Sequence, residues 1–213
     1  MILMPSNNTG KPVRDLFKAH PDRIAMLLNP QRFRPSYYTY RYAIDNGAFT
    51  TFNEKAFIRM LDGCPKSNPP IFVVVPDVVK CHDRTVALWN YYAPKLRRYG
   101  FPLAFAAQDG CIPDTLPADA DWIFVGGSNG WKSSMVEPFV ATGRPVHVGR
   151  VNGIGFVRYC ESVGVKSVDG TGFMRARGST FWNFINYFNG EVQLGLPTDN
   201  ESVLRVSETV PRG

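Results

Sequence analysis

Acidic and amide side chains follow four apolar, β-like runs of this 213-residue chain. The four residues are Asp45, Asp77, Gln108 and Asp169. If the runs are parallel strands of one barrel, their carboxyl ends meet at one mouth, and the four side chains converge on a single pocket. The spacing therefore predicts an enzyme whose chemistry depends on carboxylates.

Asp169 is the candidate nucleophile. It precedes the glycine-containing turn 170–172, which lets a ligand approach the carboxylate closely, and Arg175 and Arg177 follow within a few residues. A carboxylate at a barrel mouth beside arginines suits a nucleophile that is held ionised near a phosphodiester. The competing interpretation is an aspartate that caps a turn and pairs with an arginine.

Asp45 is a second candidate carboxylate, in the segment Asp-Asn-Gly-Ala-Phe that ends at Phe49. It could act as an acid or base, or hydrogen-bond the edge of a nucleobase. Because Asn46-Gly47 is also a turn signal, a purely local role is the alternative. Asp77 and Gln108 offer an acceptor and an amide to a planar heterocycle.

Two glycine-rich loops, 126–130 and 149–153, follow later strands. Such loops can bring backbone N–H groups against a phosphate, so a sugar-phosphate enzyme is a competing hypothesis. Neither loop matches a P-loop or the dinucleotide fingerprint, which disfavours a nucleotide cofactor, and we expect no cofactor. His147 lies inside an apolar run, where a position in the core or behind a catalytic residue is a commoner role than catalysis itself.

The elements that must position these residues alternate along the chain. We expect strands at 2–4, 24–28, 42–44, 71–75, 103–107, 122–125, 146–148 and 167–168. We expect helices at 13–19, 54–61, 83–99, 135–142, 155–163 and 179–188. Alternation of this kind indicates parallel strands, in either an open doubly wound sheet or a barrel.

Eight strands favour closure, so the predicted fold class is α/β, a compact (β/α)8 TIM-like barrel with parallel strands. We expect residues 1–197 to form this single catalytic domain. The segment 198–213 has little apolar periodicity and is expected to be a loosely ordered tail.

The link at 30–40 contains Arg32, Arg34 and several tyrosines where a helix would be expected. Arginines that pair with phosphates, interleaved with rings that stack on bases, could form a nucleic-acid surface, although an ordinary packed loop is the alternative. The chain has a formal charge of +6 and a pI near 9.2, which suits a polyanionic partner or simply serves solubility.

The four cysteines and three histidines are scattered, without the spacing of a zinc site or a disulfide framework, so we expect no metal. The apolar opening at residues 1–4 is far too short for a signal peptide or a membrane span. We therefore expect a soluble, cytoplasmic protein with no membrane partner.

Five motifs, taken together and in order, resemble the tRNA-guanine transglycosylase superfamily, and most closely its compact branch of DNA-modifying 7-deazaguanine transglycosylase-like proteins. They are Asp45-Asn46-Gly47-Ala48-Phe49, Pro76-Asp77, Ala107-Gln108-Asp109-Gly110, Val125-Gly126-Gly127-Ser128 and Val168-Asp169-Gly170 through Arg175. The resemblance spans about residues 44–177. It implies a cytoplasmic protein of bacterial or viral origin.

The resemblance also implies roles for particular residues. Asp169 matches the nucleophile that attacks the sugar C1′ and forms a covalent glycosyl-enzyme, and Asp45 matches the general acid/base. Two separated carboxylates that divide these duties make chemical sense, as in glycoside cleavage. The expected base pocket comprises Asp77, Gln108, Gly126, Gly127, Asn46 and Phe49. The expected nucleic-acid contacts are Arg175, Arg177, Arg150, Arg32 and Arg34.

The tRNA-acting members of that superfamily carry a zinc site of clustered cysteines and a histidine, which this sequence lacks. DNA, either single-stranded or with a flipped nucleotide, is therefore the expected partner, together with a free 7-deazaguanine-type base. The leading hypothesis is exchange of guanine in DNA for a 7-deazaguanine derivative. A DNA glycosylase that resolves the same intermediate with water, a sugar-phosphate enzyme and a noncatalytic nucleic-acid-binding barrel are the alternatives.

Overall fold

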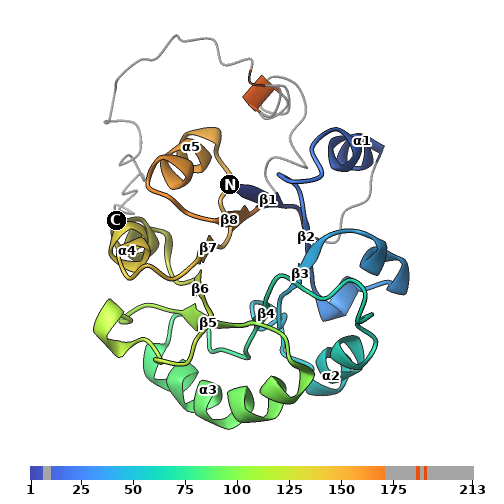
Figure 1. The fold of residues 1–213 in the computed structure, drawn as a ribbon. Coiled ribbons are helices and arrows are strands. Elements are labelled where there is room, and N and C mark those ends of the chain that lie inside the picture. Colours follow the sequence, from blue (N-terminus) through green and yellow to red (C-terminus); the bar gives the residue numbers. More distant parts are fainter. Residues whose placement is uncertain (7–10, 171–185, 188–189, 191–213) are drawn as a thin grey trace, which may run out of the picture.

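A computed structural model describes residues 1–6, 11–170, 186–187 and 190, and it contains a barrel of eight parallel strands (Figure 1). The strands are β1 Ile2–Met4, β2 Met26–Leu28, β3 Tyr42–Ile44, β4 Val73–Val74, β5 Leu103–Ala107, β6 Trp122–Val125, β7 Val146–Val148 and β8 Ser167–Asp169. Hydrogen-bonded neighbours run in the order β1-β8-β7-β6-β5-β4-β3-β2. Parallel bridges from Leu3 to Ile24 and from Ser6 to Leu27 link the two outer strands and nearly close the sheet.

Five α-helices lie between the strands and surround the barrel (Figure 1). They are α1 Lys11–Ala19, α2 Glu54–Asp62, α3 His82–Leu96, α4 Asn129–Val140 and α5 Ile154–Ser162. Short 3-10 helices occupy Pro30–Arg32, Pro35–Thr39, Arg97–Tyr99 and Pro113–Thr115. The predicted (β/α)8-type fold is confirmed, and the β2–β3 link lacks an α-helix, as expected. The predicted helix at 179–188 and the tail at 198–213 fall wholly or mainly outside the described residues.

Side-chain alternation divides the core into two layers, one outside and one inside the barrel. The outer layer, between strands and helices, includes Met26, Phe105 and Val148. The inner layer consists of Met4, Ala25, Leu27, Ala43, Phe72, Val74, Ala104 and Ala106, with Ile2, Ile71, Trp122 and Phe124 packed against them. Four alanines on the inner face leave room inside the barrel, whereas the aromatic rings fill part of it.

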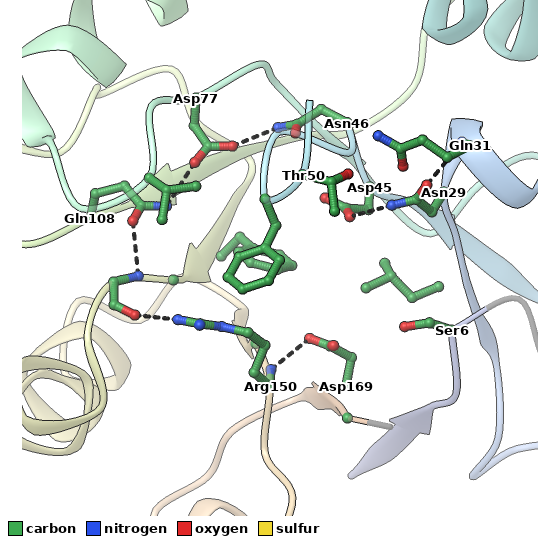
Figure 2. A pocket seen from close by; sticks show the side chains of 18 of the residues that line it. Ser6, Asn29, Gln31, Asp45, Asn46, Thr50, Asp77, Gln108, Arg150 and Asp169 are labelled. Atoms are coloured by element: carbon green, nitrogen blue, oxygen red, sulfur yellow. Dashed lines mark hydrogen bonds between the residues drawn. The ribbon is translucent and has the colours of Figure 1, made fainter. Parts of the chain in front are cut away.

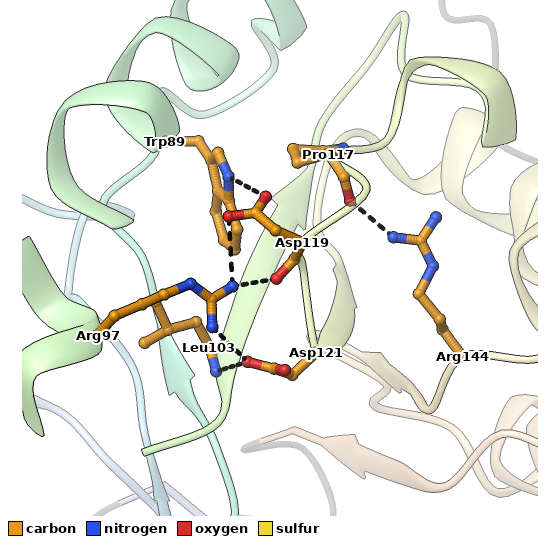
Figure 3. A network of polar contacts seen from close by, with 7 residues as sticks. All are labelled: Trp89, Arg97, Leu103, Pro117, Asp119, Asp121 and Arg144. Atoms are coloured by element: carbon orange, nitrogen blue, oxygen red, sulfur yellow. Dashed lines mark hydrogen bonds and ion pairs between the residues drawn. The ribbon is translucent and has the colours of Figure 1, made fainter. Parts of the chain in front are cut away.

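The β5–β6 connection has no α-helix and is fastened instead by a polar network at the amino ends of these strands (Figure 3). Arg97 pairs with Asp119 and Asp121 at 3.3 Å each and also donates to the Asp119 carbonyl. Asp119 accepts from Trp89 Nε1 at 3.1 Å, and Asp121 accepts from the Leu103 backbone N–H at 2.8 Å. The network ties the start of β5 to the loop that enters β6.

None of the helices in the described ranges is long and apolar enough to cross a membrane.

Candidate active site

A pocket of about 800 Å³ opens at the carboxyl ends of the strands (Figure 2). All eight strands contribute to its wall with a residue at or just beyond the strand end. These residues are Ser6, Asn29, Asp45, Asp77, Gln108, Gly126, Arg150 and Asp169. The predicted convergence of the four motifs on a single pocket is therefore observed, because the parallel strands all end at the same mouth.

Asp169 ends β8 and is almost fully buried, with 7% of its surface exposed. Its Oδ1 atom accepts two hydrogen bonds, from the Arg150 backbone N–H at 3.1 Å and from His147 Nε2 at 3.0 Å. Two N–H donors on one oxygen stabilise negative charge and fix the orientation of the carboxylate. Such a group is suited to act as a nucleophile.

Asp45 faces the same pocket but lies in a different environment. Its Oδ2 accepts a long hydrogen bond from Asn29 Nδ2 at 3.3 Å, and the backbone of Gly47 also contacts the carboxyl. Burial raises the pKa of Asp45 to about 7, and the negative charges of Asp77 and Asp169 add to the effect. A carboxyl with a pKa near neutrality can both give and take a proton, which suits a general acid/base.

Asp77 is held by two amide side chains of the pocket wall. Its Oδ1 accepts from Asn46 Nδ2 at 2.8 Å, and its Oδ2 accepts from Gln108 Nε2 at 2.7 Å. Burial raises the pKa of Asp77, while these two hydrogen bonds oppose the rise. Each carboxyl oxygen keeps a lone pair that a ligand could use.

Gln108 and Asn46 are themselves buried and largely engaged within the protein. Gln108 Oε1 accepts from the backbone N–H groups of Lys80 at 2.8 Å and Gly127 at 2.9 Å. Asn46 donates to the Val75 carbonyl as well as to Asp77, and its Oδ1 accepts from Ala48 N. Their amides therefore orient Asp77 and the surrounding loops, and Gln108 has a single amide hydrogen left for a ligand.

Several backbone N–H groups of the two predicted glycine-rich loops are engaged within the protein, some by backbone carbonyls and others by side chains. Gly127 N donates to Gln108, and Ser128 N donates to Asp109 at 2.8 Å. In the second loop, Arg150 N donates to Asp169 Oδ1. These donors orient carboxylate and amide groups, so they are not free to cradle a phosphate.

Within the described ranges, Lys80 and Arg150 are the two non-glycine residues with positive φ, at 61° and 58°. This left-handed conformation is strained for residues with a side chain, and such residues cluster at functional sites. Both residues use it to direct a backbone N–H at a pocket side chain, Gln108 in one case and Asp169 in the other.

The pocket mouth carries an exposed ring and cationic groups. Phe49 is 64% exposed, and the Arg150 guanidinium lies 4.8 Å from the centroid of its ring. Arg150 also donates to the Gly127 carbonyl, and Arg32 lines the pocket. Arg34 is exposed but does not line it.

Arg175 and Arg177, the remaining predicted nucleic-acid contacts, lie outside the described residues.

Three buried polar residues lie beneath the pocket: His147, which the sequence predicted to be buried, and Ser167 and Lys132, which sequence reasoning did not single out. His147 and Ser167 are fully buried and joined at 2.8 Å between His147 Nδ1 and Ser167 Oγ. Lys132, in the first turn of α4, is 1% exposed, and burial together with the Arg150 charge lowers its pKa to about 8. The sequence did contain a signal for Ser167. In Ser167-Val168-Asp169, residues two apart on a strand share a face, so Ser167 is expected on the same face as Asp169.

Among the described residues, no three His, Cys, Asp or Glu side chains are grouped so that they could hold a metal ion.

No family model and no curated protein matches this sequence. Among solved structures, the fold is similar to one described as a cube-shaped, highly porous protein cage designed by fusing symmetric oligomeric domains. The TM-score is 0.50 at 11% identity, over 89% of this chain and 72% of that chain. A likeness at this identity concerns the fold alone, so the resemblance to the transglycosylases stays a prediction.

Proposed function

We propose that this protein is a base-exchange enzyme that acts on guanine in DNA through a covalent intermediate on Asp169. The observation that carries the proposal is the pair of differently held carboxyls, Asp45 and Asp169, in the wall of one pocket. The pocket volume of about 800 Å³ falls within the range of about 300–1,000 Å³ typical of small-molecule sites, which is enough for a purine and its sugar.

The reaction has two displacement steps. The Asp169 carboxylate forms a bond to the sugar C1′ while the bond from C1′ to the base breaks and its electron pair leaves with the base. Asp45 in its protonated form gives a proton to the departing base. An incoming 7-deazaguanine-type base then loses its proton to Asp45 and bonds to C1′, and the bond between C1′ and Asp169 breaks.

The other groups of the pocket serve recognition. Asp77 offers acceptor positions to the edge of the base, and the exposed ring of Phe49 offers a surface for stacking. Arg150 and Arg32 place positive charge at the mouth, where the nucleic-acid backbone would pass. Because C1′ is inaccessible in a stacked duplex, the target nucleotide must be single-stranded or flipped out.

A sugar-phosphate substrate suits this pocket less well. Asp45, Asp77 and Asp169 would repel a phosphate, and the N–H donors of Gly127 and Arg150 are occupied by side chains. Water in place of the second base would give a glycosylase, which the same experiment detects.

The test uses single-stranded DNA, duplex DNA and tRNA, each with radiolabelled guanine, with and without 7-cyano-7-deazaguanine. Release that depends on the added base supports exchange, and release without it indicates hydrolysis. Asp169→Asn should abolish release, whereas the surface control Asp114→Asn should leave it unchanged. Full release by Asp169→Asn would refute the proposed nucleophile, and absence of release from every substrate would refute the proposed function.

A further inference from the structure

The two carboxyl oxygens of Asp169 are not equivalent. Oδ1 accepts from Arg150 N and His147 Nε2. In the described part of the chain, Oδ2 has no hydrogen-bond partner, and Asp169 lines the pocket. Because an oxygen that already accepts two hydrogen bonds is a poor nucleophile, Oδ2 is the oxygen available to a substrate.

The first donor, His147, is held in place by two aromatic rings and two hydrogen bonds. Its ring is fully buried, stacked on Phe124 at 4.7 Å between centroids and packed edge-on against Phe72 at 5.2 Å. A carboxylate only accepts hydrogen bonds, so Nε2 must carry the proton that points to Asp169. With the proton on Nε2, Nδ1 can accept from the Ser167 hydroxyl at 2.8 Å, which favours this tautomer.

The second donor, Arg150 N, belongs to a peptide group that is contacted at both ends. The carbonyl of this peptide, on Gly149, accepts a hydrogen bond from the buried ammonium of Lys132 at 2.5 Å. A positive charge at the carbonyl polarises the peptide and strengthens its N–H as a donor. Gly149 leaves room for this arrangement, because a Cβ atom would lie 3.0 Å from the Phe124 ring and 3.3 Å from Asp169 Oδ1 and would press on both.

We infer that His147 and Lys132 are positioning residues that hold Oδ1 of Asp169, so that Oδ2 is the atom that bonds to the sugar. The inference rests on the proposed function and specifies which carboxyl oxygen of Asp169 reacts with the sugar. In the intermediate, Oδ2 is the ester oxygen and Oδ1 the carbonyl oxygen. When the C1′–Oδ2 bond breaks, its electron pair returns to the carboxylate, and the two donors on Oδ1 stabilise the charge that appears.

Loss of a donor on Oδ1 should therefore slow breakdown of the intermediate more than its formation. For His147→Leu we expect base exchange to fall about ten- to a hundred-fold, the range for loss of one hydrogen bond to a charged group. The fraction of protein covalently bound to labelled DNA after denaturation should rise. His147→Gln, which can place an amide N–H near the position of Nε2, should restore both values towards wild type.

Lys132→Met removes the charge but keeps the length of the side chain, and it should shift the covalent fraction in the same direction. His82→Leu and Lys55→Met serve as controls outside the pocket wall and should change neither value. A purely structural role of His147 would lower activity without changing the covalent fraction. That result, or an unchanged rate in His147→Leu, would overturn the inference.

A second measurement is independent of activity. In ¹⁵N-labelled wild-type protein, the His147 ring should show a proton on Nε2, and this signal should shift in Asp169→Ala but not in the control Asp114→Ala. A ring with a bare Nε2 would overturn the inference even in an active enzyme. If the protein releases no base at all, the proposed function fails, whereas the proton position still tests the hydrogen bond that the inference requires.

Discussion

The half-buried carboxyl of Asp45 should make the protein less stable as the pH rises towards neutrality. Its pKa is raised from the ordinary value of 3.8 to about 7, chiefly by burial. Below pH 3.8 the group is protonated in both the folded and the unfolded states. Between pH 3.8 and 7 the unfolded chain ionises first, so the folded state progressively loses the stability that the neutral group confers.

The size of this effect follows from the shift. One pKa unit corresponds to about 1.4 kcal/mol, so a shift of about 3 units amounts to about 4 kcal/mol at pH 8, as an upper value for a partly accessible group. Asp45→Asn never ionises and keeps an oxygen that can accept from Asn29. We therefore expect this variant to be more stable than wild type at pH 8, by up to about 4 kcal/mol.

The assay is urea unfolding followed by tryptophan fluorescence at pH 4, 5, 6, 7 and 8. The quantity of interest is the difference in unfolding free energy between Asp45→Asn and wild type, because other titrating groups largely cancel in it. This difference should grow from pH 4 to pH 7 and then level off. Asp114→Asn, at an exposed position, should show no such growth. A difference that stays constant over the whole range would refute the argument.

Four further results are expected. Formation of the covalent intermediate should slow as the pH rises through about 7, because Asp45 must be protonated to act as the acid, and single-turnover rates would measure this. Gly126→Ala would place a Cβ atom 2.5 Å from Gln108 Nε2, and displacement of that buried amide should lower urea stability by about 1–3 kcal/mol and impair base release. Arg32→Gln should reduce the salt dependence of DNA binding by about one unit of slope without changing thermal stability, as a filter-binding salt titration would report. Arg97→Met should cost about 1 kcal/mol in urea unfolding and leave base release unchanged, because its ion pairs lie at the opposite end of the barrel.

The sequence was sufficient to predict the fold because its signals are local. Each expected strand overlaps an observed one, since short β-branched runs bounded by turn residues mark strands well. The main differences are in length: β4 has two paired residues where five were expected, and β2 has three where five were expected. Pairing depends on neighbouring strands and on barrel curvature, which a single strand's residues do not encode.

The candidate site was predictable only in part. Asp45 and Asp169 were found because each stands directly at a strand end, where a barrel gathers its functional residues. His147 was predicted to lie in the core or behind a catalytic residue, because it stands within an apolar strand. Its contact with Asp169 arises from the pairing of β7 with β8, in which His147 lies opposite Ser167. Such a pairing becomes visible only in three dimensions.

The two ends of the barrel divide stability and function between them. The pocket end carries a half-buried carboxyl of raised pKa at Asp45 and strained backbone at Lys80 and Arg150, each of which weakens the fold. The amino end carries the Arg97 network, whose charged groups satisfy one another. Features that reduce stability persist where the surrounding structure enforces them and where chemistry needs them. Asp45, Lys80 and Arg150 all lie at the carboxyl end of the strands, which is an argument for function there that does not depend on any resemblance in sequence.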